Sequence, residues 1–246
     1  MKASPEAQLR LLELADLDAE LGRLDHRRRT LPEIAQLEQI GARTGELRDG
    51  IVMADTDLSD LGREQTRAER DVEQVRQRID RDRSRLDGGQ VSAARELSNL
   101  QSEVESLLRR QSDLEEVVLD AMERRETAEA RRAELVTEQQ DLTVQAAELT
   151  TKRDAALEEI GEQAAKAEAN RTEVAADVPA DVLTLYDKLR AQQGVGAAML
   201  RRGSCEGCHL TLHTVDLNQI RATPADEVVR CEECRRILVR TAESGL

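Results

Sequence analysis

The stretch LSNLQSEVESLLRRQSDLEEVV, residues 97–118, opens the pattern that decides the fold. Its apolar side chains recur at alternating steps of three and four residues, and the same steps continue as far as Val174. Of the 23 positions visited from Leu97 to Val174, 16 are apolar. A repeat of about 3.5 residues held this long is typical of a helix that winds around a partner in a left-handed coiled coil.

The partner helix is expected earlier in the chain. Ser4-Pro5-Glu6 is a helix start, with a serine cap, a proline at the first position and an acid in the first turn. Apolar residues at coiled-coil spacing then recur through 14–86. Pro32 interrupts this run, because proline removes an amide donor and clashes with the preceding turn. A kink or a register shift is therefore expected at Pro32.

The chain is expected to reverse direction at Gly88-Gly89, its only glycine pair. The segments 5–86 and 90–172 on either side are nearly equal in length, as the two arms of one hairpin must be. The prediction is a mainly α fold, with a long antiparallel coiled-coil hairpin over 1–175 and its tip near 87–90. The seam also contains polar residues, which set the register, loosen the packing or contact a bound partner helix: Gln111, Arg125, Arg132 and Gln139.

The composition agrees with a rod of paired helices. The 246 residues include no Phe, no Trp and one Tyr, and 35% of them are charged. A conventional enzyme with a deep apolar pocket is disfavoured, since aromatic rings supply much of the buried area in such folds. The formal net charge of −14 argues against uniform wrapping of nucleic acid or an anionic membrane. The absence of a signal-peptide pattern and of an apolar run long enough to span a membrane favours the cytoplasm.

The second predicted domain, 176–246, combines a short helix with a cluster of cysteines. Pro179 precedes an apolar-faced helix over 180–192. Two C-x-x-C pairs follow, separated by 22 residues, and such pairs aim four thiolates at one tetrahedral zinc ion. The predicted ligands of one structural Zn²⁺ are Cys205, Cys208, Cys231 and Cys234. The expected strands of this small β zinc ribbon are 197–202, 209–212, 227–230 and 237–240, with one helical turn over 214–221.

Three other interpretations of the cysteines explain less. Cys205-x-x-Cys208-His209 also matches a c-type haem attachment signal, but that interpretation leaves Cys231 and Cys234 without a role. Redox-active pairs usually lie in a βαβ context, which this sequence does not show. A catalytic zinc keeps one position open, whereas four cysteines close the coordination shell. His209 and His213 are expected to surround the site without binding the metal.

Arginines gather at the two ends of the predicted fold. The tip region 63–95 contains nine arginines against seven acids, whereas 133–187 carries 13 acids against four bases. A nucleic-acid interpretation would use the arginines as phosphate contacts; the simpler interpretation is a solvated helix surface with i,i+4 ion pairs. The candidate partner or nucleic-acid contacts are Arg76, Arg81, Arg83, Arg85, Arg201, Arg202, Arg235 and Arg236.

The whole pattern resembles the bacterial C4-type zinc-ribbon family with an N-terminal coiled-coil hairpin. The resemblance rests on ARELSNLQSEV at 94–104, GVGA at 194–197, RGSCEGCH at 202–209 and CEECRRIL at 231–238. Zinc knuckles often carry glycine after the second cysteine, whereas His209 and Arg235 stand there in this chain. The resemblance implies a non-enzymatic zinc protein. In some members it implies binding to a sigma-54-type transcription factor, to flagellar or secretion components, or to a messenger RNA.

The leading hypothesis is a non-enzymatic adaptor or chaperone-like regulator that binds protein partners through the coiled coil and the ribbon. The alternative is an RNA- or DNA-binding regulator that uses the ribbon and the tip arginines. No membrane partner is expected, and association of two copies stays open. An enzyme is disfavoured, because no carboxylate, histidine and nucleophile set converges in the predicted fold.

Overall fold

The structure is a computed structural model that describes residues 1–89 and 93–246. The chain divides into two compact units, each of which is described by itself. The helical unit comprises Gln36–Leu149, and the base unit comprises Met1–Ala35 together with Thr150–Leu246. This division differs from the sequence-based one at 175/176, because the N-terminal helix belongs to the same unit as the C-terminal strands.

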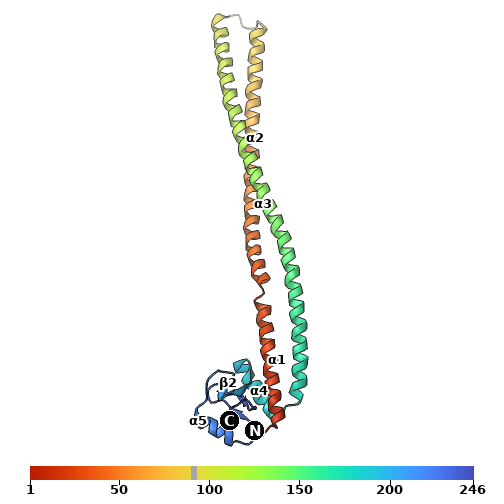
Figure 1. Ribbon diagram of the computed structural model, residues 1–246. Helices are drawn as coiled ribbons and strands as arrows, with labels where there is room; N and C mark the ends of the chain where they lie inside the picture. The colour runs from red at the N-terminus through yellow and green to blue at the C-terminus, as the bar shows by residue number, and fades with distance from the viewer. Residues whose placement is uncertain (90–92) are drawn as a thin grey trace. The chain divides into compact units, whose positions relative to one another are not determined.

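The helical unit pairs most of α2 (Pro32–Asp87) with the first part of α3 (Ala94–Ala176), which run side by side in Figure 1. Buried residues of α2 recur every seven positions at Leu47, Ala54, Leu61 and Ala68. The facing residues of α3 show the same repeat; they include Leu114, Ala121 and Leu135. The predicted coiled-coil hairpin is therefore confirmed. Gly89 has a left-handed φ of 64°, whereas residue 90 of the predicted tip lies outside the described residues.

Two of the polar seam residues reach across to α2. Arg132 forms an ion pair with Asp55, and Arg125 donates to Oε1 of Gln65 over 3.3 Å. Gln111 instead donates to Glu115 of its own helix over 2.7 Å. Cross-helix pairs at Arg132 and Arg125 favour one alignment of the helices over a slipped one, which supports the register-setting interpretation for these two positions.

The predicted interruption at Pro32 is a complete break between two helices. α1 (Pro5–Arg29) ends at the cap residue Thr30, and α2 begins at Pro32. The Ser4 hydroxyl accepts from the Ala7 amide over 3.2 Å at the start of α1, as the cap signal predicts. Leu31 in the break is buried beside Leu24 and Ile160, so apolar packing continues where the backbone hydrogen bonds stop.

The base unit places a four-stranded sheet against helices. Its strands are β1 (Ala197–Arg201), β2 (Ser204–Cys205), β3 (Val229–Arg230) and β4 (Ile237–Val239), in the order β2-β1-β4-β3. β1 and β4 are parallel, whereas the two outer pairs are antiparallel. The sheet packs on α1 and on α4 (Ala180–Gln193) through a core that contains Leu11, Leu14 and Tyr186.

Three of the four strand predictions, at 197–202, 227–230 and 237–240, are correct in place but too long. The expected strand at 209–212 is wrong: the chain turns there instead, and one isolated bridge joins Ser204 to Thr211. The expected turn at 214–221 is a nine-residue helix, α5 (Thr214–Ala222). Gly196 enters β1 so close to α4 that a Cβ there would run into the carbonyl oxygen and ring of Tyr186. Among the described helices none is long and apolar enough to cross a membrane.

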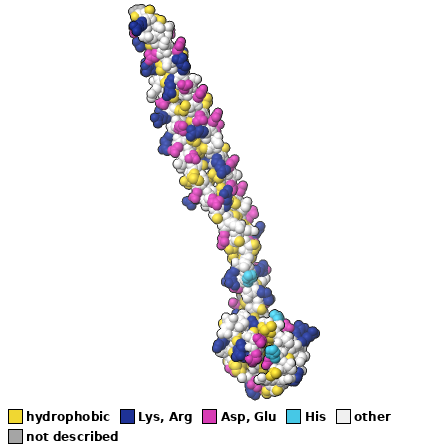
Figure 2. All heavy atoms as spheres, turned by 90° about the vertical axis from the view of Figure 1, so that its left-hand side faces the viewer, with side chains coloured by type: hydrophobic (Ala, Val, Ile, Leu, Met, Phe, Trp, Pro, Cys, Tyr) yellow, Lys and Arg dark blue, Asp and Glu magenta, His cyan; other side chains and the backbone are white. Residues whose placement is uncertain are grey.

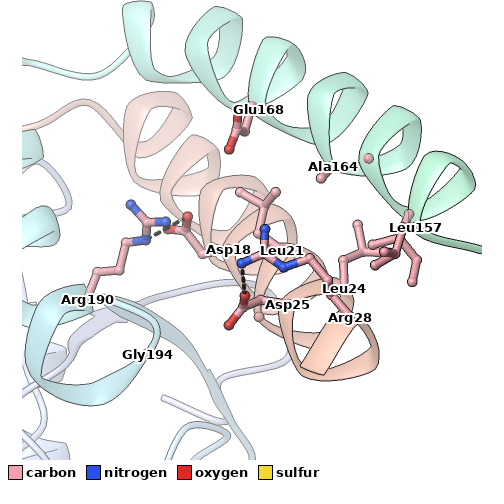
Figure 3. Close-up of a pocket in the computed structure, with 13 residues that line it drawn as sticks. Asp18, Leu21, Leu24, Asp25, Arg28, Leu157, Ala164, Glu168, Arg190 and Gly194 are labelled. Atoms are coloured by element: carbon pink, nitrogen blue, oxygen red, sulfur yellow. Dashed lines mark hydrogen bonds and ion pairs between the residues drawn. The ribbon is translucent and has the colours of Figure 1, made fainter. Parts of the chain in front are cut away.

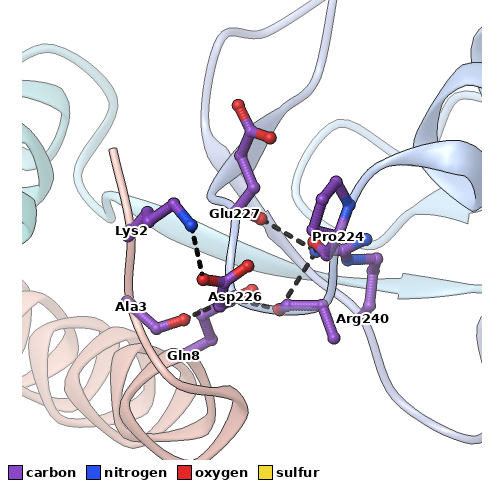
Figure 4. Close-up of polar contacts among 8 residues, drawn as sticks. Lys2, Ala3, Gln8, Pro224, Asp226, Glu227 and Arg240 are labelled. Atoms are coloured by element: carbon purple, nitrogen blue, oxygen red, sulfur yellow. Dashed lines mark hydrogen bonds and ion pairs between the residues drawn. The ribbon is translucent and has the colours of Figure 1, made fainter.

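The first residues of the chain form hydrogen bonds with the segment around Asp226 (Figure 4), a contact that the sequence pattern did not predict. The Ala3 amide donates to the Asp226 carbonyl over 2.8 Å, and the Val228 amide donates to the Met1 carbonyl over 3.1 Å. The Gln8 amide group donates to the carbonyls of Ala3 and Ala225, each over 2.9 Å. These contacts join the first residues of the chain to the segment that leads into β3.

A buried carboxylate ties three helices of the base unit together. Asp18 of α1 has a fully buried side chain that accepts from Arg171 Nε of α3 over 2.8 Å. It also accepts from the Tyr186 hydroxyl of α4 over 2.6 Å and pairs with Arg190 Nε over 2.8 Å. Burial opposes the charge on Arg171, but its hydrogen bonds to Asp18 and Asp187 raise its pKa overall. Burial, followed by the hydrogen bond to Asp18, also raises the pKa of Tyr186.

Candidate metal centre

Two tight turns bring the four predicted ligands together. The Cys205 amide donates to the Leu210 carbonyl over 3.0 Å, and the His209 amide donates back to the Cys205 carbonyl over 2.7 Å. The turn at Cys231 repeats this pattern, with bonds of 2.9 Å to the carbonyl of Arg236 and from the amide of Arg235. The two C-x-x-C pairs therefore form turns with the same hydrogen-bond pattern, and each turn supplies two of the four ligands.

The sulfur positions fit a tetrahedral ion. All four Sγ atoms lie within 4.8 Å of one another, with Cys205 to Cys234 at 3.8 Å and Cys208 to Cys231 at 3.9 Å. A zinc ion with bonds of about 2.3 Å holds its sulfurs about 3.8 Å apart. Cys205 and Cys231 are buried, and Cys208 and Cys234 are half-buried, so water has restricted access to the site. The donor set and its spacing match a closed structural zinc site.

The thiols differ in how readily they lose their protons. Burial raises the pKa of Cys205 to about 12 and also raises the pKa of Cys231. Burial acts in the same direction on Cys234, but hydrogen bonds from Arg236 and from neighbouring thiols lower its pKa to about 7. Zinc binding needs thiolates, so occupation of the site must release protons from the buried cysteines.

The residue that follows the second cysteine of each C-x-x-C pair adopts a backbone conformation that usually requires glycine. His209 has a φ of 59° and Arg235 a φ of 65°, both in the left-handed region. Residues other than glycine adopt this backbone conformation at a cost of roughly 1–2 kcal/mol. The two turns are therefore built as glycine-type turns but carry large side chains. His209 and His213 are exposed and lie outside the cluster of four sulfurs.

Arg236 supports the site from within the fold. Its guanidinium donates to the carbonyls of Gln193 over 2.9 Å, Val195 over 3.2 Å and Gly207 over 3.0 Å. A Cβ on Gly207 would lie 2.9 Å from both Ala198 Cβ and Arg236 Cδ, so glycine is required there. The sequence offered one sign of this close packing, since Gly207 is the only glycine inside either C-x-x-C pair.

The structure distributes the other candidate arginines over both units. Arg201 pairs with Glu243 over 2.9 Å, and Arg235 pairs with Glu232 over 3.6 Å. On the helical unit Arg76 pairs with Glu115 over 2.6 Å, and Arg85 with Asp82 over 3.8 Å. Three of these candidate arginines form no ion pair with an acid within residues 1–89 and 93–246: Arg81, Arg83 and Arg202.

Comparisons with known proteins agree with this architecture. Residues 14–194 match the CT398-like coiled coil hairpin domain, and residues 204–238 match the C4-type zinc ribbon domain. The uncharacterized protein Rv2229c of Mycobacterium tuberculosis is 38% identical over 240 residues, which are 98% of both chains. A solved structure from Mycobacterium smegmatis is 35% identical, with a TM-score of 0.84, and covers 98% of this chain and all of that one.

A more distant structure shares the fold alone. CT398 from Chlamydia trachomatis is 18% identical with a TM-score of 0.72, over 96% of this chain and 98% of its own. Neither matched domain family is described as enzymatic. With four clustered thiols that fit one zinc ion and a paired helical segment before them, this chain belongs to the family of CT398-like coiled-coil hairpin proteins that carry a C4-type zinc ribbon.

Proposed function

We propose that this protein is a non-enzymatic adaptor that works in the cytoplasm and binds protein partners through its helical hairpin and its zinc ribbon. Four thiolates complete the tetrahedral shell, so the metal keeps no position for a substrate. The ion instead holds together a small module whose own apolar core is limited. This leaves the surfaces of the two units as the parts that act.

Exposed apolar side chains on both units carry the proposal. Val52 and Met53 are neighbours on α2 and are 60% and 64% exposed. Val144 of α3 is 60% exposed, and Val215 at the start of α5 in the zinc module is 75% exposed. On the helical unit, Figure 2 shows such apolar side chains among interspersed acids and bases. Adjacent exposed apolar side chains with polar residues around them, such as Val52 and Met53, are one arrangement found where a partner covers a surface.

The partner classes implied by the family resemblance are transcription, secretion and motility components. They are the first proteins to look for, and association of two copies is the other outcome of interest. The test is purification of the tagged full-length protein from its own cells after brief crosslinking, with and without nuclease. The expected result is a defined set of proteins that survives nuclease and about 0.5 M salt.

Two variants make this test specific. Replacing Val52 and Met53 by serine should deplete at least one of the recovered proteins, because it removes the exposed apolar pair. Asp49→Ser, a change at an exposed neighbour, should deplete none. Recovery of the same proteins, in the same amounts, with all variants and with an unrelated tagged protein would remove support for an adaptor.

A second candidate function is nucleic-acid binding, favoured by Arg81, Arg83 and Arg202, which have no acidic partner in the part of the chain that the structure describes. Phosphate contacts would give an affinity that falls steeply with salt. Reversal of these three charges should then abolish binding to cellular RNA or DNA fragments, whereas Arg76→Glu should weaken it less because that arginine already pairs with Glu115. Arg236 is unsuited to this test, since its loss would disturb the metal site itself.

A further inference from the structure

A groove in the base unit has the dimensions of a helix-binding site. It encloses about 630 Å³ between the faces of α1 and α3, beside the end of α4 (Figure 3). On α1 its lining runs from Asp18 to Arg28, and on α3 it runs from Leu157 to Glu168. Each stretch spans about three helical turns, or roughly 15 Å.

The floor of the groove is apolar and lacks side chains at two points. Leu21 and Leu157 are half-buried, and Ile160, also in the lining, is buried. Gly22 of α1 and Gly161 of α3 both line the groove, and a Cβ at either would meet nothing within 4 Å. A glycine inside a helix costs about 1 kcal/mol relative to alanine. Packing among the described residues does not account for that cost at either position.

The charges around the groove select one kind of occupant. Arg28 pairs with Asp25 over 3.1 Å, and Arg190 pairs with Asp18, so these groups already satisfy one another. Glu168 points from α3 toward the groove in Figure 3 and has no ion-pair partner in the part of the chain that the structure describes. The groove lining holds three acids against two bases, which leaves one carboxylate in excess.

We propose that this groove binds an amphipathic helix of a partner protein, with its apolar face on Leu21 and Leu157 and a Lys or Arg against Glu168. A small ligand would need several convergent polar groups to orient it, whereas the charged groups here are paired except for Glu168. Two helix faces with an open apolar channel between them match the helix-in-groove mode of recognition. The inference rests on the proposed adaptor function and assigns one of its binding surfaces.

The test uses a labelled synthetic peptide of about 16 residues, roughly four helical turns. It carries leucines at helical spacing with lysines on both sides, and its controls are a scrambled peptide and one with glutamate in place of lysine. Fluorescence anisotropy with the zinc-loaded full-length protein should give saturable one-to-one binding of the lysine peptide. The scrambled and glutamate peptides should bind at least about tenfold more weakly.

Matched variants locate the binding. Gly161→Leu fills the groove and should weaken binding by about tenfold or more, whereas Gly41→Leu, also in open helical space, should leave it unchanged. Glu168→Lys should weaken binding several-fold at low salt, and Glu162→Lys, which lies outside the groove lining, should have little effect. Circular dichroism of every variant establishes that the helices are intact.

Three outcomes would overturn the proposal: no saturable binding of the lysine peptide, equal binding of the scrambled peptide, or equal effects of Gly161→Leu and Gly41→Leu. The same variants separate this proposal from the broader one. If Gly161→Leu leaves the proteins recovered from cells unchanged while the serine replacements at Val52 and Met53 deplete them, the adaptor function stands and the groove is not its site.

Discussion

Replacing Asp18 by asparagine should destabilise the base unit more than any other single polar substitution we consider. Asp18 is fully buried and accepts from Arg171, Tyr186 and Arg190 at distances of 2.6–2.8 Å. Asparagine keeps the shape but removes the negative charge, so two guanidinium groups then face a neutral amide. Loss of one partner from a buried ion pair typically costs about 3–5 kcal/mol.

The structure places the expected loss at the lower end of that range. Arg171 is 18% exposed and Arg190 is 38% exposed, so both can recover some hydration when Asp18 loses its charge. A destabilisation of about 3 kcal/mol is expected, because the remaining penalty falls mainly on Arg171. For a chain of this size, about 3 kcal/mol lowers the melting temperature by roughly 6–12 °C.

The chain contains its own reporter for this measurement. Tyr186 is the only aromatic residue and bonds directly to Asp18, so its near-ultraviolet signal follows the cluster while the signal at 222 nm follows all helices. Thermal unfolding of Asp18→Asn would be compared with Asp16→Asn, an exposed change on the same helix. If the free energies of unfolding that the tyrosine signal gives for Asp18→Asn and for that control differ by less than about 1 kcal/mol, the buried cluster does not stabilise the fold as argued.

Three further outcomes are expected. Removal of zinc, or Cys205→Ser, should change the tyrosine signal but leave most helical signal at 222 nm, because α2 and α3 lie largely in the helical unit. His209→Gly and Arg235→Gly should each raise the stability of the zinc module by up to about 1 kcal/mol in metal-dependent unfolding, whereas Arg221→Gly in α5 should lower it. The raised pKa of Tyr186 means that its neutral form contributes stability that is complete below the ordinary pKa of a phenol and is lost as pH rises toward the folded-state value. Absorbance at 295 nm should therefore show no tyrosinate in the native protein near pH 11, and its early appearance without unfolding would contradict the burial of the ring.

The sequence predicted the hairpin well because its signals are local and repeated. The seven-residue spacing of Leu47, Ala54 and Leu61 is visible in the chain and is the spacing at which those residues are buried. The ligand set was equally accessible, since a short spacing within each C-x-x-C pair leaves few ways to arrange four thiols. The interruption at Pro32 follows from proline chemistry alone.

The features that the sequence did not reveal depend on contacts between distant segments. Nothing near Met1 or Ala3 indicates that they pair with residues 226 and 228. The parallel pairing of β1 with β4 requires two segments about forty residues apart to meet side by side, and local sequence patterns do not report such a pairing. Asp18 did carry a signal, because it stands four residues after Leu14 and three before Leu21, on an otherwise apolar helix face.

The zinc module is a structural part of the base unit, because one sheet separates two cores. In β4, Ile237 and Val239 face the core that contains Leu11 and Tyr186, whereas Leu238 faces the core that contains Cys205 and Cys231. Alternate residues of a strand point to opposite faces, so the metal fixes the back of the surface on which α1 rests. Loss of the metal would free β4 on one face and thereby weaken the packing of α1 on the other. The ion thus stabilises a helix that contributes none of its ligands, which accounts for a closed zinc site in a protein that otherwise has a single aromatic ring for its core.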